Sequence, residues 1–243
     1  MFHLHVDRTD STNNHMRRLI SEGKVYNLDM LTANFQTAGR GQVGNTWESA
    51  YAENLLVSIV LMPAHLDVRQ QYYLSMAISS AVARALTPLV GSLKMKWPND
   101  IYVGNKKLGG ILIENTLKGT LIQNSIVGIG LNVNQTEFTQ GAPNPISIKN
   151  ITGTSHSPTT IALSIQTELA KALQLIDAEM FEYVHSEYMQ VLYRFDGQNH
   201  PYADANGQFS ARIVGVEPDG HLFLLDTNGQ TRRYAFKEVE FVF

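Results

Sequence analysis

The chain has 243 residues, of which 44% are hydrophobic and 17% are charged, and its formal net charge is −3. These values predict a globular protein with one large domain, or with one domain and a smaller second one, and they give no overall attraction to nucleic acid or anionic membranes. The chain has no cysteine, which excludes disulfides, thiolate nucleophiles and cysteine-ligated metals.

The first residues lack the basic-then-apolar profile of a signal peptide, and we find no apolar run of membrane-spanning length, so we expect a cytoplasmic protein. Residues 2–6 alternate and predict a short strand. The run Ser11-Thr12-Asn13 offers N-cap residues to an amphipathic helix that ends near Gly23. These side chains either cap the helix, which is the commoner use of such residues, or bind a ligand.

A glycine-rich loop at residues 37–47 lies between two predicted strands, residues 30–36 and 55–61. Glycines let the backbone approach a ligand, and free N–H groups together with Arg40 suit an anion; the alternative is a surface loop with Arg40 in solvent. Gln36 enters the loop with an amide that either contacts a polar ligand or solvates the strand end. The glycines also fit G-x-G-x-x-G, but no amphipathic helix follows them, so we reject NAD binding.

Residues 67–90 predict a long core helix with one apolar face. After the next strand, Lys96, Asn99 and Asp100 lie within five residues beside a tryptophan, and Lys107 precedes paired glycines. A cation, an amide and a carboxylate at one strand end suit a phosphate-and-metal site. Taken alone, however, the pattern is slightly more typical of a β-hairpin with solvated charges.

The C-terminal half alternates between helical and β patterns. Residues 121–134 predict one long strand or two, and the glycines within it are typical of a close approach by a ligand or by another backbone. Residues 138–154 predict a loop, and residues 157–193 a long helical region. Short hairpins beyond a polar linker predict a small SH3-like barrel, so we expect two domains, residues 1–194 and 195–243.

Five motifs occur in an order that resembles biotin protein ligases, that is, biotin–[acetyl-CoA-carboxylase] ligases, over about residues 6–135. They are Ser11-Thr12-Asn13, Gly39-Arg40-Gly41 with Gly44 and Trp47, Lys96-Trp97-Pro98-Asn99-Asp100, Lys107-Leu108-Gly109-Gly110-Ile111 and Gly128-Ile129-Gly130-Leu131-Asn132-Val133-Asn134. The resemblance implies an α+β fold with a mixed, mainly antiparallel sheet and helices, as in class II tRNA synthetase cores, plus a C-terminal SH3-like β-barrel. It also implies that biotin and ATP, with Mg²⁺, form biotinyl-5′-AMP, and that biotin then passes to a lysine of a biotin carboxyl carrier protein.

The resemblance also implies roles for individual residues, with Lys107, Arg40, Lys96 and Asp100 as the catalytic set. Arg40 and Lys107 would hold the biotin carboxylate and the α-phosphate, Lys96 would hold phosphates, and Asp100 would hold Mg²⁺ and, with Asn99, place the nucleotide. The residues expected to hydrogen-bond the ureido ring are Ser11, Thr12, Asn13 and Gln36. Further binding positions are Gly41, Gln42, Trp47, Gly110 and Asn132, of which Asn132 would contact the nucleotide. A closing loop at residues 39–47 would protect the adenylate from water.

Many relatives carry arginines at the positions of Gln42 and Val43, and often a third arginine at the position of Asn45. We therefore expect loop contacts from Arg40, Gly41 and Gln42, and no phosphate role for Val43 or Asn45. The motifs begin at residue 11, so we expect none of the N-terminal DNA-binding domain by which some relatives repress biotin genes. Alternatives are a lipoate ligase or lipoyl transferase of the same fold, and a biotin-binding module without turnover. The expected partner is a carrier protein, with no nucleic acid and no membrane, and exposed sheet edges allow a homodimer.

Overall fold

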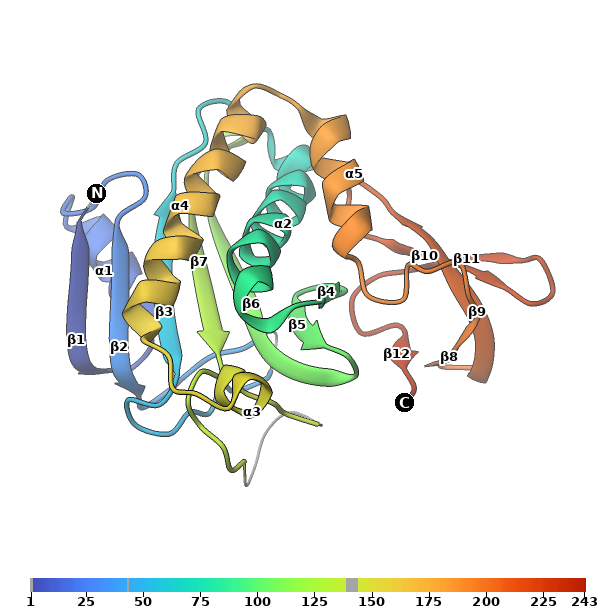
Figure 1. Cartoon of the computed structure of the whole chain (residues 1–243). Coiled ribbons are helices and arrows are strands. Elements are labelled where there is room, and N and C mark those ends of the chain that lie inside the picture. The colour runs from blue at the N-terminus through green and yellow to red at the C-terminus, as the bar shows by residue number, and fades with distance from the viewer. Residues whose placement is uncertain (1, 43, 139–143) are drawn as a thin grey trace.

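The computed structural model describes residues 2–42, 44–138 and 144–243. A seven-stranded sheet, in the spatial order β1-β2-β3-β7-β6-β5-β4, forms the larger body (Figure 1). Its strands are β1 (His3–Thr9), β2 (Met30–Gln36), β3 (Leu55–Leu61), β4 (Leu93–Lys96), β5 (Asp100–Val103), β6 (Lys106–Lys118) and β7 (Leu121–Leu131). β1 and β2 are parallel, and the other neighbours are antiparallel. The predicted mixed, mainly antiparallel sheet is therefore confirmed.

The two faces of this sheet are used differently. α2 (Gln71–Val90) and α4 (Pro158–Asp177) cover one face, and the short α1 (Thr12–Ser21) lies on the other (Figure 1). Successive residues of β7 face opposite sides of the sheet. Val127 and Ile129 belong to the main core, whereas Ile126 packs with Met16 of α1. The glycines of β7 lie on the α1 side, where the sheet stays open to a ligand.

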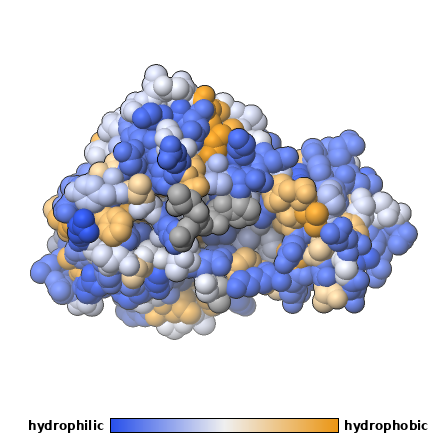
Figure 2. Space-filling model, turned by 90° about the horizontal axis from the view of Figure 1, so that it is seen from below, coloured by the Kyte–Doolittle hydropathy of each residue, from blue (hydrophilic) through white to orange (hydrophobic). Residues whose placement is uncertain are grey.

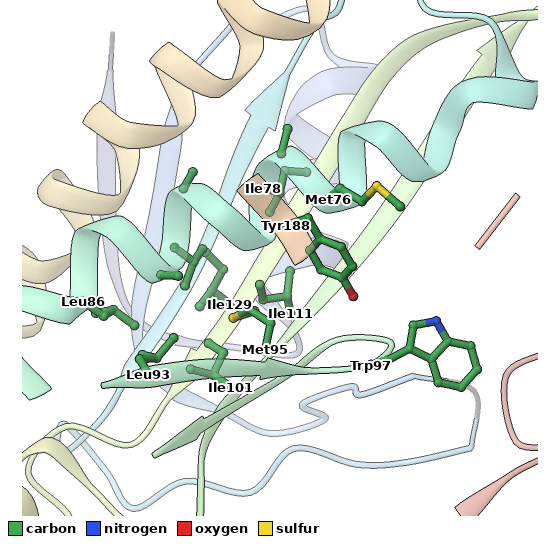
Figure 3. Close-up of a cluster of buried hydrophobic side chains, with 14 of the residues drawn as sticks. Met76, Ile78, Leu86, Leu93, Met95, Trp97, Ile101, Ile111, Ile129 and Tyr188 are labelled. Atoms are coloured by element: carbon green, nitrogen blue, oxygen red, sulfur yellow. The ribbon is translucent and has the colours of Figure 1, made fainter. Parts of the chain in front are cut away.

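The main core fills the space between α2 and the sheet. Figure 3 shows Met76, Ile78 and Leu86 of α2 above Met95, Ile101, Ile111 and Ile129 of the strands, with Tyr188 beside them. Burying a side chain of this size contributes about 1.5–3 kcal/mol relative to leaving it exposed. α2 and the preceding turn η1 (Val68–Gln70) are together long and apolar enough to cross a membrane, contrary to our expectation. Because 67% of the apolar window of this stretch is buried and packs on the sheet, we assign it to the core.

The C-terminal residues form a second, five-stranded sheet in the order β11-β10-β9-β8-β12. Its strands are β8 (His200–Asp204), β9 (Gly207–Val216), β10 (Leu222–Asp226), β11 (Thr231–Tyr234) and β12 (Glu240–Phe241). The predicted hairpins are confirmed, but β11 and β12 remain edges, and no pairing closes a barrel within the described residues. The sheet is joined to the larger body by a hydrogen bond of 3.0 Å from Trp97 Nε1 to the Gly220 carbonyl.

Two helical details differ from the prediction. The expected helix over residues 157–193 is two helices, α4 and α5 (Phe181–Val191), because Glu179 adopts a φ of 53° between them. The expected loop over residues 138–154 contains the short α3 (Ile148–Thr152), which begins at a capping box formed by Ser147 and Asn150. For residues 121–134, the structure confirms the alternative of one long strand, β7.

Candidate active site

A cleft of about 930 Å³ lies on the open face of the large sheet and reaches the C-terminal sheet. All the residues predicted to bind or catalyse line it, namely Ser11, Thr12, Asn13, Gln36, Arg40, Gly41, Gln42, Trp47, Lys96, Asn99, Asp100, Lys107, Gly110 and Asn132. Figure 2 shows that the lower face of the molecule is mostly hydrophilic. The three cations Arg40, Lys96 and Lys107 therefore share one cavity.

The N-terminal end of α1 supplies a buried polar corner of the cleft. Gln36 Oε1 accepts hydrogen bonds from the Thr12 backbone N–H (2.7 Å) and from Thr12 Oγ1 (3.1 Å). Asn13 is fixed by Ser58, whose Oγ donates to Asn13 Oδ1 at 2.6 Å. The Ser11 side chain is buried, yet it makes no capping hydrogen bond within the described part of the chain. Since capping does not employ it, the ligand-binding reading of this motif is favoured.

Gly128 of β7 is what allows Asn13 to lie against the sheet. A Cβ built on Gly128 would overlap all three end atoms of the Asn13 side chain. Because Asn13 is held from two sides, by Ser58 and by Glu114, it has little freedom to move away. Gly128 is therefore required by the position of Asn13 in the site, and not only by the geometry of the sheet.

A second strand glycine, Gly130, seats the glycine loop (residues 39–47). A Cβ on Gly130 would overlap the Trp47 ring. The described part of the loop folds back on itself: Trp47 N–H donates to the Gly39 carbonyl at 3.0 Å, and Gly41 N–H donates to the Asn45 carbonyl at 2.9 Å. No helix occurs among the described residues between β2 and β3, so the predicted strand–loop–strand setting of the glycines is confirmed. Val43 lies outside the described residues.

Arg40 of the glycine loop is already paired with a carboxylate that the motifs did not single out. Its Nη2 lies 2.6 Å from Glu114 Oε2 on β6. Glu114 also accepts hydrogen bonds from Asn13 Nδ2 at 2.7 Å and from Arg17 Nη2 at 2.7 Å. Burial raises the pKa of Glu114, but the hydrogen bonds from Asn13, Arg17 and Arg40 outweigh it and hold this pKa below its ordinary value.

The end of the cleft opposite the polar corner is built on β5 and β6. Lys107 Nζ lies 2.6 Å from Asp100 Oδ1, and each side chain is about four-fifths buried, with 19% and 20% exposed. Asn99 Nδ2 donates to the Ile111 carbonyl at 2.7 Å, and Asn132 Nδ2 donates to the Ile146 carbonyl at 3.1 Å, which fixes the orientation of both amides. The C-terminal sheet and its connections add cleft-lining residues that the sequence did not suggest, among them Phe241 of β12 and Lys237 of the connection before it.

Lys96 is a partly buried cation of the cleft that lies against aromatic rings. Its Nζ lies 4.7 Å from the centre of the Phe241 ring and 5.6 Å from that of Tyr102. Burial lowers the pKa of Lys96, Lys107 and Arg194 lower it further, and only Asp100 acts in the opposite direction. A buried ammonium of this kind is a cost to the free protein that a bound polyanion would offset.

We therefore expect Lys96→Met to separate stability from activity. Methionine keeps the length of the side chain and its contact with the aromatic rings while removing the buried charge. The melting temperature should equal or exceed that of the wild type, whereas the affinity for ATP should fall by at least about tenfold, the effect of losing a charge-assisted hydrogen bond. Thermal unfolding and an ATP titration check both; a lower melting temperature with unchanged ATP affinity would contradict this role.

The donor set for a metal is small. Among the described residues, no group of three or more His, Asp and Glu side chains could hold a metal ion. Asp100 offers one carboxylate beside Lys107 and Lys96. This donor set fits Mg²⁺, which binds through one or two carboxylates together with substrate phosphates and water. It does not fit a metal held by the protein alone.

A sequence model of the biotin/lipoate A/B protein ligase family matches residues 5–132, which is more than half of the chain. The chain belongs to this family. The matched range includes the cleft residues contributed by α1, the glycine loop and strands β4 to β7. It ends before the C-terminal sheet, whose contribution to the cleft is seen only in the structure.

Several characterised proteins are similar to this member of the biotin/lipoate ligase family. The bifunctional ligase/repressor BirA of Bacillus subtilis is 26% identical over 220 residues, covering 87% of this chain and 65% of that protein. The biotin–[acetyl-CoA-carboxylase] ligase of Mycobacterium tuberculosis is 33% identical over 134 residues, covering 54% of this chain and 48% of that protein. This chain thus spans less than two thirds of these curated relatives. The biotin protein ligase from Aquifex aeolicus in complex with biotin and ATP has a TM-score of 0.79 at 25% identity, covering 98% of this chain and 97% of that one.

Proposed function

We propose that this protein is an ATP-dependent biotin ligase. Biotin is activated as biotinyl-5′-AMP and is then transferred to a specific lysine of a biotin carboxyl carrier protein. The observation that carries the proposal is the meeting of three cations, Arg40, Lys96 and Lys107, with a buried polar corner in one cleft. A ligand with a neutral polar ring at one end and a carboxylate at the other fits that arrangement.

The first half-reaction joins two anions. A carboxylate oxygen of biotin attacks the α-phosphorus of ATP, a P–O bond forms, and the bond to pyrophosphate breaks. Lys107 and Arg40 would neutralise the carboxylate and the α-phosphate, and Lys96 would stabilise the departing pyrophosphate. Mg²⁺, held by Asp100 and by phosphate oxygens, would supply further neutralisation. Holding both reactants in one cleft also lowers the entropic cost of their meeting.

The second half-reaction uses the carrier as the nucleophile. The amine of the carrier lysine attacks the acyl carbon of the adenylate, the amide bond forms, and AMP leaves with the electrons of the C–O bond. The glycine loop would cover the adenylate until then, because a mixed anhydride exposed to water hydrolyses. Trp47, seated on Gly130, and the Gly39–Trp47 hydrogen bond are the contacts that would place this cover.

The A. aeolicus relative was solved with biotin and ATP, and the M. tuberculosis relative is named for biotinylating acetyl-CoA carboxylase. Lipoate ligases belong to the same family, but lipoate has no ureido ring to engage the buried polar groups of Ser11, Thr12, Asn13 and Gln36. The polar corner therefore favours biotin over lipoate.

The domain division also enters as part of this proposal, with a catalytic domain at residues 1–194 and a C-terminal domain at residues 195–243. The main core is continuous across this boundary, since Tyr202 and Leu224 belong to the same buried cluster as the residues under α2. We further propose a cytoplasmic location, which suits an ATP-consuming reaction in a chain without cysteine. β1 is an edge strand of the large sheet and would be the site of pairing in a homodimer.

Mass spectrometry of a carrier domain tests the function directly. The domain is incubated with the protein, Mg-ATP, and either biotin or lipoate. We expect one biotinyl group on one lysine, dependent on ATP, and little or no lipoyl group. Preferential lipoylation would assign the protein to the other branch of its family, and a domain unmodified by either acid would refute the proposal.

A further inference from the structure

Glu114 is the only carboxylate within the described residues that touches both the polar corner and the glycine loop. Resting on the proposed function, we propose that Glu114 is a positioning residue that holds Arg40 until the biotin carboxylate or the adenylate phosphate displaces it, and that Arg17 holds Glu114 after the exchange. Glu114 would thus act as a resident anion in the free protein, and the loop would change partners on ligand binding.

Strand geometry places Glu114 on the cleft face. Glu114 pairs with Ile126 of β7, which packs with Met16 of α1, so the Glu114 side chain lies on the α1 side of the sheet, where the cleft is. Its two carboxylate oxygens are divided between different partners. Oε2 accepts from Arg40 and Asn13, and Oε1 accepts from Arg17. The carboxylate therefore links the loop cation, the polar corner and the outer surface of α1.

The exposure of the partners explains why the contact with Arg40 is exchangeable. The Arg40 side chain is 38% exposed, whereas that of Glu114 is 22% exposed. Ion pairs reached by solvent contribute little to stability, so a ligand anion can compete for Arg40. Two further contacts of the described loop residues, the internal Gly39–Trp47 hydrogen bond and the packing of Trp47 on Gly130, involve no charge with which such an anion would compete.

Arg17 accounts for the charge that remains behind. If Arg40 left a mostly buried carboxylate without a cation, the cost would be large. Arg17 approaches from α1, 2.7 Å from Oε1, and its position is steadied by Asn14 Oδ1, which accepts from Arg17 Nη1 at 3.2 Å. Because Arg17 binds the opposite oxygen, it can stay in place while Arg40 moves to the ligand.

The test compares a charged and a neutral ligand that share the ureido ring, namely biotin and biotinol, its alcohol analogue. In Glu114→Gln, Arg40 has lost its competitor, so the Kd for biotin should fall about two- to fivefold relative to that for biotinol, the range expected for an exposed ion pair. In Arg17→Ala, the ratio of the Kd for biotin to the Kd for biotinol should rise. A disturbance of Asn13 would change both affinities together and leave the ratio unaltered.

Glu168→Gln is the matched control, because Glu168 also bridges two cations, Arg84 and Lys171, but neither of these cations lines the cleft, whereas Arg40 does. It should leave the ratio unchanged. A ratio that is unchanged or raised in Glu114→Gln, with both ligands binding, would overturn the exchange. Hydrogen exchange of the loop amides in ligand-free protein supplies a reading independent of biotin. The Glu114→Gln substitution should speed hydrogen exchange of these amides, and unaltered exchange would contradict the proposal. Failure of the wild type to bind either ligand would instead count against the biotin assignment.

Discussion

Lys107→Ala is expected to reduce biotin-dependent pyrophosphate release by about 10²–10³-fold, the usual effect of removing one group that stabilises developing charge. Lys107 lies on β6, is four-fifths buried, and lies 2.6 Å from Asp100 in the cleft. Alanine would leave the Asp100 carboxylate without this cation. It would also remove positive charge from the place where the biotin carboxylate and the α-phosphate of ATP must meet. Stopped-time assays of pyrophosphate release, at saturating biotin and ATP, measure the loss.

Lys106→Ala is the control for this variant. Lys106 is the preceding residue on the same strand, but its side chain is exposed and does not line the cleft. Its rate should stay within about twofold of the wild type, as for an ordinary surface substitution. The assignment of Lys107 would be wrong if both alanine variants released pyrophosphate at similar rates while circular dichroism showed both folded.

Gly128→Ala is expected to weaken biotin binding by about 10- to 100-fold, which corresponds to leaving one or two buried polar groups badly paired. The added methyl group would occupy the space of the Asn13 amide. Asn13 would then lose its alignment with Ser58 and with the ureido ring. Isothermal titration with biotin measures the change, and the affinity for ATP should be affected far less.

Gly215→Ala is a suitable companion variant because Gly215 also lies in a strand, β9, and a Cβ there meets nothing within 4 Å. It should leave biotin affinity unaltered. If Gly128→Ala bound biotin as tightly as Gly215→Ala did, Asn13 would have no part in holding the ring, and the polar corner would need another explanation.

Much of the site was predictable because its motifs are local. Lys96 to Asp100 and the glycine loop each combine the necessary residue types within a few positions, and strand-ending patterns place them in connections rather than in element interiors. The strand–loop–strand setting of the glycines was also visible in the sequence, and the structure has this setting. The order of the motifs along the chain gave the resemblance, and the resemblance implied that the motifs meet in one site. In the structure, residues of these motifs line one cleft.

The remaining features depend on contacts distant in sequence. Glu114 bonds with partners 74, 97 and 101 residues away, and nothing in its immediate neighbours distinguishes it from a solvated strand end. Phe241 reaches Lys96 only because the C-terminal sheet docks beside Trp97. The split between α4 and α5 depends on a left-handed residue, Glu179, where no glycine marks the turn. The open second sheet likewise follows from long-range pairing that hairpin signals do not determine.

Biotin-dependent exchange of labelled pyrophosphate into ATP is the most direct test of one cleft that joins a carboxylic acid to the α-phosphate. With biotin, the wild-type protein should incorporate label into ATP in a Mg²⁺-dependent manner, and with biotinol in place of biotin incorporation should stay at background. Incorporation that is as fast without biotin as with it, or none with biotin present, would contradict the account.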